Sequence, residues 1–120
     1  MLAHLRNLGA LDRLDRAATI IEQSGLCPNM YLHPYNGTIS ATGALLRAFD
    51  VSDKIIASWD GDVMTLKLPD MQFALFNELY RLLELVVDAD LDTWNDEATA
   101  EDVIRAYRRL RHLIEFANTK

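Results

Sequence analysis

The 120-residue sequence predicts an α+β fold, mostly helical: a single compact domain, residues 1–120, of three to four helices with one or two small β-hairpins. Three observations predict it. Several long segments repeat apolar residues every three or four positions, as amphipathic helices do. Two stretches of β-branched and aromatic residues flank Asn-Gly and Asp-Gly, the strongest short hairpin signals. Half of the residues are hydrophobic and a quarter are charged, which is typical of a globular chain with one core.

The first helix is expected at Ala10–Ser24, with Gly25 placed to end it. Its apolar residues recur at helical spacing: Leu11, Leu14, Ala18 and Ile21. The leucines of residues 2–8 either extend this helix or form a separate turn, and Gly9 favours the break.

Two hairpins and a short helix are expected next. Residues 31–33 can pair with 38–40 across Asn36-Gly37, although a two-stranded ribbon alone is marginal. A helix is predicted over 41–49. The strands of the second hairpin are expected at 54–59 and 63–68, around Asp60-Gly61, with a helical turn at 52–57 as the alternative.

The strongest helix signal runs from Asp70 to Val87, where Asp70 follows Pro69 and can cap the helix. Apolar residues cover most of its circumference, so we expect it to be the core element around which the others pack. A last amphipathic helix is predicted over Ala100–Ala117. Its apolar face contains Val103, Ala106, Tyr107, Leu110, Leu113, Ile114 and Ala117, and its basic face contains Arg105, Arg108, Arg109 and His112.

An acidic segment joins these two helices and carries much of the net charge of −6. Asp88, Asp90 and Asp92 have the spacing of the first calcium ligands, but Thr93 and Thr99 stand where the motif needs Gly and Glu. Acids on one loop also lack the separation of a catalytic carboxylate pair. The segment therefore predicts neither a metal site nor a catalytic site.

A structural motif explains the segment better. Thr99 and Asp102 have the spacing of a capping box at the start of the last helix. Trp94 is then expected to be a buried anchor between two packed helices, and Asn95 and Asp96 are expected to hydrogen-bond loop backbone.

The segments LDRAATIIEQSGL, SATGALLRAF and LDTWNDEATAEDVIRAYRRL resemble a family of small uncharacterised proteins of actinobacteria and their phages, a domain of unknown function. That family is marked by an A-x-x-I-E helix, a C-x-x-G-A-L helix and a W-N-D loop. Ser40 stands at the family's cysteine position, and residues 50–70 show no resemblance. The resemblance implies an actinobacterial or phage origin and assigns no activity.

The remaining residues give no catalytic, cofactor or metal signature. Cys27 has no visible base to activate it and no metal-ligand spacing with the three histidines. No phosphate loop, nucleophile elbow or dinucleotide fingerprint occurs. No stretch reaches the roughly 18 apolar residues of a membrane span, and the N-terminus lacks a signal peptide's apolar core. We therefore expect a cytoplasmic protein without cofactors, and the sequence leans against an enzyme.

The basic face of the last helix allows three interpretations. It is a solvated face paired with the chain's own acids, a protein-binding face, or a nucleic-acid surface, which the neighbouring acids and the pI of about 4.9 oppose. Arg105, Arg109 and His112 are the candidate partner-binding residues. The function expected is a non-enzymatic intracellular protein-interaction or regulatory protein, such as a phage accessory factor acting on a host protein, and a homodimer is compatible with it. The alternative is a small-molecule-binding protein or enzyme without a recognisable motif, with a pocket between the hairpin and the helix at 70–87. A deep pocket that holds Tyr31, Trp59 and a buried polar group would favour this alternative.

Overall fold

The computed structural model describes residues 2–117, and its regular elements in that range are helices. In chain order they are α1 (Leu2–Leu5), η1 (Arg6–Leu8), α2 (Ala10–Ser24), α3 (Ala41–Ala48), α4 (Asp53–Ser58), η2 (Val63–Leu66), α5 (Asp70–Val87), α6 (Leu91–Glu97) and α7 (Ala100–Glu115), where η marks a 3-10 helix. The predicted α+β class is wrong, and the expected three to four helices become seven α-helices over residues 2–117.

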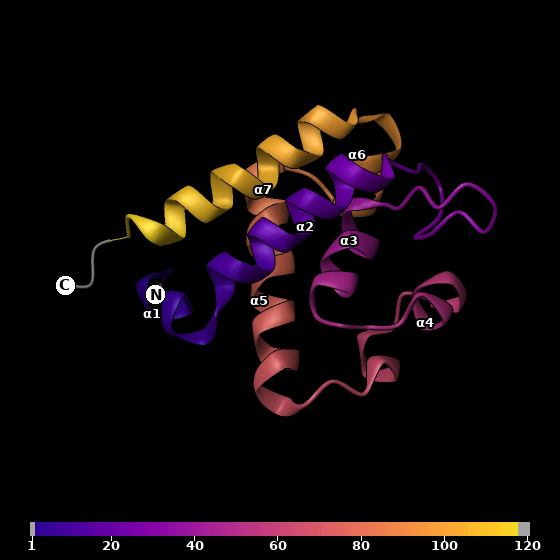
Figure 1. Ribbon diagram of the computed structural model, residues 1–120. Coiled ribbons are helices and arrows are strands. Elements are labelled where there is room, and N and C mark those ends of the chain that lie inside the picture. The colour runs from indigo at the N-terminus through magenta and orange to yellow at the C-terminus, as the bar shows by residue number, and fades with distance from the viewer. Residues whose placement is uncertain (1, 118–120) are drawn as a thin grey trace.

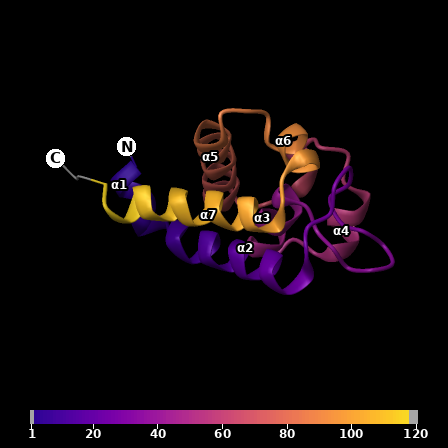
Figure 2. The same cartoon turned by 90° about the horizontal axis from the view of Figure 1, so that it is seen from above.

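The longest helices form two layers. α2 and α7 lie side by side and run antiparallel, while α5 stands behind them and crosses them (Figures 1 and 2). Ion pairs fix the register of the antiparallel pair: Arg108 lies 3.0 Å from Glu22, and Arg111 lies 2.7 Å from Asp15. One hydrophobic core contains residues from both layers.

The centre of that core is α3 rather than α5. Seven of its eight residues are buried: Ala41, Thr42, Gly43, Ala44, Leu45, Leu46 and Ala48. Gly43 is needed there, because a Cβ atom would lie 2.3 Å from the carbonyl oxygen of Tyr31. The expectation that the helix at 70–87 is the core element is wrong, since Met71 is 66% exposed and Leu85 is 64% exposed.

Neither predicted hairpin forms. The first leaves only isolated bridges from Ile39 to Leu26 and to Leu32, because the chain turns into α3 directly after Ser40. A ribbon this short has no third strand to support it.

The second hairpin is replaced by α4 and η2. Ser52 accepts a hydrogen bond from the backbone N–H of Ile55 and so caps a helix over residues expected to form a strand. Asp62 caps η2 by accepting from the N–H of Met64, and the Trp59 indole N–H donates to the Asp62 carbonyl oxygen. The helical alternative for residues 52–57 was therefore the correct one.

The other expected helices are present with small corrections. α2 and α5 have the predicted bounds, but Pro69 rather than Asp70 occupies the cap position of α5. α3 and α7 end one and two residues before the predicted ends, at Ala48 and Glu115. Leu113, which was expected on the apolar face of α7, is 42% exposed. Within residues 2–117, no helix has the length and apolarity needed to cross a membrane.

Candidate functional site

The acidic segment that was expected to be a loop folds into α6. Asp90 begins the helix by accepting a hydrogen bond from the backbone N–H of Thr93, which holds the pKa of the Asp90 carboxyl below its usual range. Glu84 accepts from the N–H of Leu91 at 2.9 Å and joins the end of α5 to the start of α6. Acidic side chains are favoured at these N–H groups because the first turn of a helix leaves them without backbone partners.

Asn95 is the most buried polar residue of α6, with 3% of its surface exposed. Its Oδ1 accepts from the backbone N–H of Ala41 at 2.8 Å, and its Nδ2 donates to the carbonyl oxygen of Cys27 at 2.9 Å. One side chain therefore satisfies two backbone groups from different segments, the first turn of α3 and the strand-like stretch before it.

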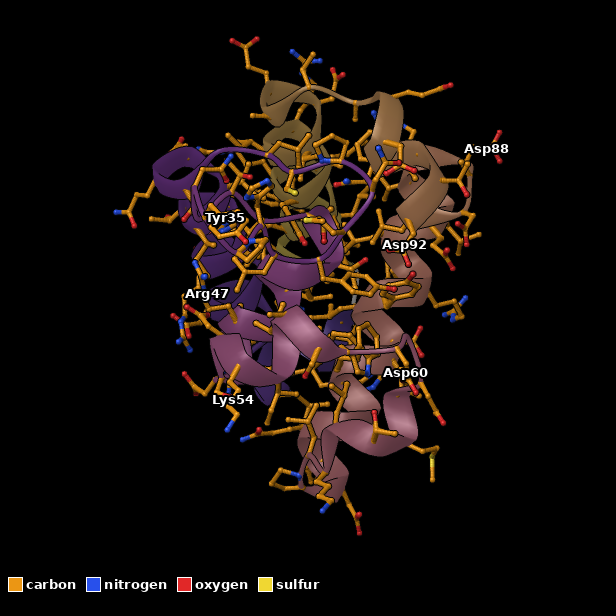
Figure 3. The ribbon with its side chains drawn as sticks, turned by 90° about the vertical axis from the view of Figure 1, so that its right-hand side faces the viewer. Tyr35, Arg47, Lys54, Asp60, Asp88 and Asp92 are labelled. Carbon is orange, nitrogen blue, oxygen red and sulfur yellow. The ribbon has the colours of Figure 1, made fainter. Side chains whose placement is uncertain are left out.

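Asp92 makes a second connection beside Asn95. Its carboxylate accepts from the Tyr31 hydroxyl at 2.8 Å and from the Thr42 hydroxyl at 2.6 Å. In Figure 3, Asp92 points into the molecule while Asp88 points away from it. Burial, and next the hydrogen bond to Asp92, raise the pKa of Tyr31, so its hydroxyl stays protonated and donates. Burial, and next the charge of Asp92, also raise the pKa of Tyr80.

Two further contacts complete the arrangement. Asp96 accepts from the backbone N–H of Asn29 at 2.7 Å, where Asn29 adopts a left-handed conformation with φ of 65°. The Tyr107 hydroxyl of α7 donates to the carbonyl oxygen of Ala41. We call Asp92, Asn95 and Asp96, with the groups they bond in residues 27–42, the α6 junction.

A shallow depression of about 280 Å³ lies on the α6 junction. It is lined by Asn29, Met30, Tyr31, Ser40, Asp92, Thr93, Asn95 and Asp96. Every buried side-chain nitrogen and oxygen atom of the described residues has a hydrogen-bond partner. The polar groups here are thus engaged with one another, as in a fold-stabilising network.

The residues predicted from the sequence to form a structural motif lie at and beside the α6 junction. Thr99 and Asp102 form the expected capping box, and the backbone N–H of Thr99 lowers the pKa of Asp102. Trp94 is half-buried and packs against the core. The bonds of Asn95 and Asp96 go to segments more than 50 residues away rather than to their own loop. Sequence reasoning placed Tyr31 in a possible ligand pocket rather than against Asp92, and it missed Thr42, because no local pattern signals partners 50 or more residues apart.

Cys27 and the histidines form no reactive group. Cys27 is buried, with 2% of its surface exposed, and its thiol donates to the carbonyl oxygen of Pro28. The Nδ1 atom of His33 accepts from the backbone N–H groups of Tyr35 and Asn36. No group of three or more His, Cys, Asp and Glu residues suited to hold a metal ion occurs within residues 2–117.

The arginines of α7 differ in where their acidic partners lie. Arg108 and Arg111 pair with Glu22 and Asp15 of α2, and Arg111 also lies 3.0 Å from Glu115. The acidic partners of Arg108 and Arg111 therefore belong to α2 and α7. Of the acidic residues between 84 and 102, Asp102 is the one that pairs with an α7 arginine, at 3.5 Å from Arg105.

The candidate partner-binding residues lie on the solvent side of α7. Arg105, Arg109 and His112 are exposed, and the side chain of Arg105 is 74% exposed. Their spacing of four and three residues places them in one row. Phe116 extends the row by one turn; it is 68% exposed, and its ring centre lies 4.6 Å from that of His112. We call these four residues the α7 ridge.

Comparison with known proteins identifies a family and no individual relative. The family whose description reads "Family of unknown function (DUF6197)" matches residues 6–113. Because this match covers most of the chain, the chain belongs to that family. No curated protein and no solved structure matches the chain. The expected membership of a family of unknown function is thereby confirmed.

Proposed function

We propose that this member of the family is a non-enzymatic protein-interaction or regulatory protein that binds an acidic surface of a protein partner through the α7 ridge. The observation that carries the proposal is the division of the α7 arginines. Arg108 and Arg111 pair with acids of the neighbouring helix α2. Arg105 instead pairs at 3.5 Å with Asp102 of its own helix and stays 74% exposed, and Arg109 is exposed as well, beside His112 and Phe116. Arginine and aromatic side chains are enriched at protein interfaces.

The chemistry of the α6 junction supports a protein without catalytic activity. Both oxygens of Asp92 accept from hydroxyl groups, and both polar atoms of Asn95 are bonded to backbone. These bonds join α6 to residues 27–42, and a structural role accounts for all of them. We therefore assign Trp94, Asn95, Asp96 and Thr99 a structural role.

Charge distribution favours a protein over a nucleic acid as the partner. The net charge is −6, and Glu101 and Asp102 lie one turn from Arg105. A phosphate backbone would meet these carboxylates at the same surface, which weakens binding that depends on phosphate contacts. An acidic protein segment can place its own carboxylates against the ridge and keep clear of the acidic first turn.

We place this activity in the cytoplasm of an actinobacterial cell, for a chain that the bacterium or its phage encodes. The whole chain 1–120 acts as a single domain. A phage accessory factor acting on a host protein fits these features. The proposal needs no cofactor or metal.

The ridge is tested by reversing its charges. The double variant Arg105→Glu, Arg109→Glu should fold normally, because exposed substitutions usually change stability by no more than about 0.5 kcal/mol. It should lose host proteins that the wild type captures, and lose binding to a synthetic Glu- and Asp-rich peptide, most clearly at low salt where charges are least screened.

The matched control is Lys54→Glu, Lys67→Glu, which changes the net charge equally on a different, exposed surface. It should retain both the captured proteins and the peptide. If the ridge variant keeps every partner and the peptide, the ridge is a solvated surface and the proposal is wrong.

A second candidate function rests on the aromatic pair beside the α6 junction. The rings of Tyr31 and Trp59 lie 4.9 Å apart, the convergence that a small-molecule site was expected to show. The depression on the α6 junction is lined by α6 and by residues between 29 and 40, whereas the pocket was expected beside the helix at 70–87. Its volume of about 280 Å³ is near the lower limit for a ligand pocket. A small polar ligand that binds there should raise the melting temperature in a saturable way.

A further inference from the structure

One face of α5 is left without a partner by the rest of the fold. Met71, Ala74, Glu78, Arg81 and Leu85 follow one another at spacings of three and four residues, so they form a single row along the helix. Met71 and Leu85 are 66% and 64% exposed, and the side chain of Arg81 is 60% exposed. Seen from above, α5 lies on the α7 side of the α2–α7 pair and extends away from it (Figure 2). We call these five residues the α5 stripe.

The stripe has the pattern of a helix–helix seam. Alternating steps of three and four residues characterise the contact row of packed helices. Large apolar side chains occupy its two ends, Ala74 is small enough to receive a large neighbour, and an ion pair between Glu78 and Arg81 occupies its centre. Such a row differs from an ordinary solvated face, which carries polar residues throughout.

The charges of Glu78 and Arg81 determine in which orientation a second α5 helix can pack on the stripe. In an antiparallel pair of α5 helices related by a two-fold axis between residues 79 and 80, Glu78 of each copy opposes Arg81 of the other. The same register places Ala74 opposite Leu85 of the second copy. A parallel pair, or an antiparallel pair centred on Glu78, brings like charges together at the seam, which is unfavourable.

We propose that the α5 stripe is the interface of a homodimer, in which two copies of the chain pack their α5 helices antiparallel. This inference goes beyond the proposed function, because the stripe and the α7 ridge lie on different helices. The isologous arrangement, in which each copy uses the same patch, is the commonest form of oligomer.

A groove beside the stripe widens the surface available to the second copy. Its volume is about 660 Å³, and it is lined by Leu2, His4, Leu5, Glu78, Arg81, Leu113, Phe116 and Ala117. The 18 residues of α5 span about 27 Å. One helix face of this length covers less than the roughly 800 Å² per partner of a stable interface. The dimer is therefore a weak one, with a dissociation constant in the micromolar range.

Sedimentation equilibrium of the full chain, over about 1 to 500 μM, tests the proposal. The wild type should shift from monomer to dimer within that range. Arg81→Glu and Glu78→Arg should each weaken dimerisation by at least about tenfold, because each places four like charges at the seam. An equimolar mixture of the two variants should dimerise again, since every charge then faces its opposite.

Two controls separate the interface from the fold. Met64→Glu changes another methionine that is 74% exposed, and it should dimerise as the wild type does. Circular dichroism should show that each variant keeps its helical content. A wild type that remains monomeric at 500 μM overturns the proposal, and so does a mixture of the two charge variants that dimerises no better than either alone. Neither result affects the test of the α7 ridge, which uses different residues and a different measurement.

Discussion

Removing the amide of Asn95 should cost the fold more than any exposed polar substitution. In Asn95→Ala, the backbone N–H of Ala41 and the carbonyl oxygen of Cys27 lose their partners, at distances of 2.8 and 2.9 Å. Asn95 is 3% exposed, so little water can replace it. Each buried group left unsatisfied costs about 1–3 kcal/mol, which gives a total loss of about 2–6 kcal/mol for the two groups.

A loss of that size is large against a total stability of about 5–15 kcal/mol. The entropy of unfolding is about 2.1 cal/mol/K per residue, so each kcal/mol should lower the melting temperature of this chain by about 4 °C. Urea unfolding followed by circular dichroism measures the free energy, and a thermal melt checks it. Asn7→Ala is the matched control, because Asn7 is exposed and should cost no more than about 0.5 kcal/mol. If Asn95→Ala proves as mild as Asn7→Ala, the α6 junction does not hold the fold together.

Two further predictions concern packing and pH. Gly43→Ala should destabilise the chain by about 1–3 kcal/mol in urea unfolding, because the new Cβ would lie 2.3 Å from the Tyr31 carbonyl oxygen; a gain in stability, as at an exposed helix position, would contradict the close approach. The pKa of Asp102 is lowered in the folded chain, so its contribution to stability is present above its unfolded pKa of about 3.9 and lost as the pH falls through the folded value. Wild type should therefore exceed Asp102→Asn in stability at neutral pH and lose that advantage progressively as the pH falls below about 3.9, and an advantage that is the same at every pH would rule out this linkage.

The longest helices could be predicted because their signals are local. The periodic apolar residues of α2 and α5 gave both bounds of each helix, and Gly25 ends α2 with φ of 83°. The capping box at Thr99 could be predicted for the same reason, since its two partners are three residues apart. Burial along a helix was harder to predict: Met71 and Leu85 continue the apolar pattern of α5 and nevertheless face solvent.

The hairpins could not be judged from turn chemistry alone. Asn36-Gly37 does make a turn, but Ser40 already caps α3 directly after Ile39, so the paired segment is too short for a ladder. Asp60-Gly61 also bends the chain, yet the caps at Ser52 and Asp62 supply local hydrogen bonds that favour helices on both sides. Local capping bonds form without closing a long loop, whereas strand pairing needs a partner strand in register.

The segments SATGALLRAF and LDTWNDEATAEDV are in contact in the structure. Asn95 accepts a hydrogen bond from the backbone N–H of Ala41, the first residue of α3, and Asp92 accepts one from the Thr42 hydroxyl. Gly43 lets α3 approach the Tyr31 backbone. Sequence reasoning placed the residues but not these contacts, because each joins positions 50 or more apart or depends on close backbone packing.

This meeting of segments explains why the most distinctive residues do not reveal the activity. The α6 junction uses the carboxylates and amide of α6 to hold a segment without regular strands, residues 25–40, against α3. Groups engaged in this way stabilise the fold and are not free for a ligand. What remains available is the exposed surface of the two long helices on either side, the α7 ridge with its unbalanced positive charge and the α5 stripe with its balanced pair. A balanced pair suits a second copy of the same chain, and an unbalanced row requires a partner of opposite charge, so the two surfaces, which meet at Phe116, select different partners.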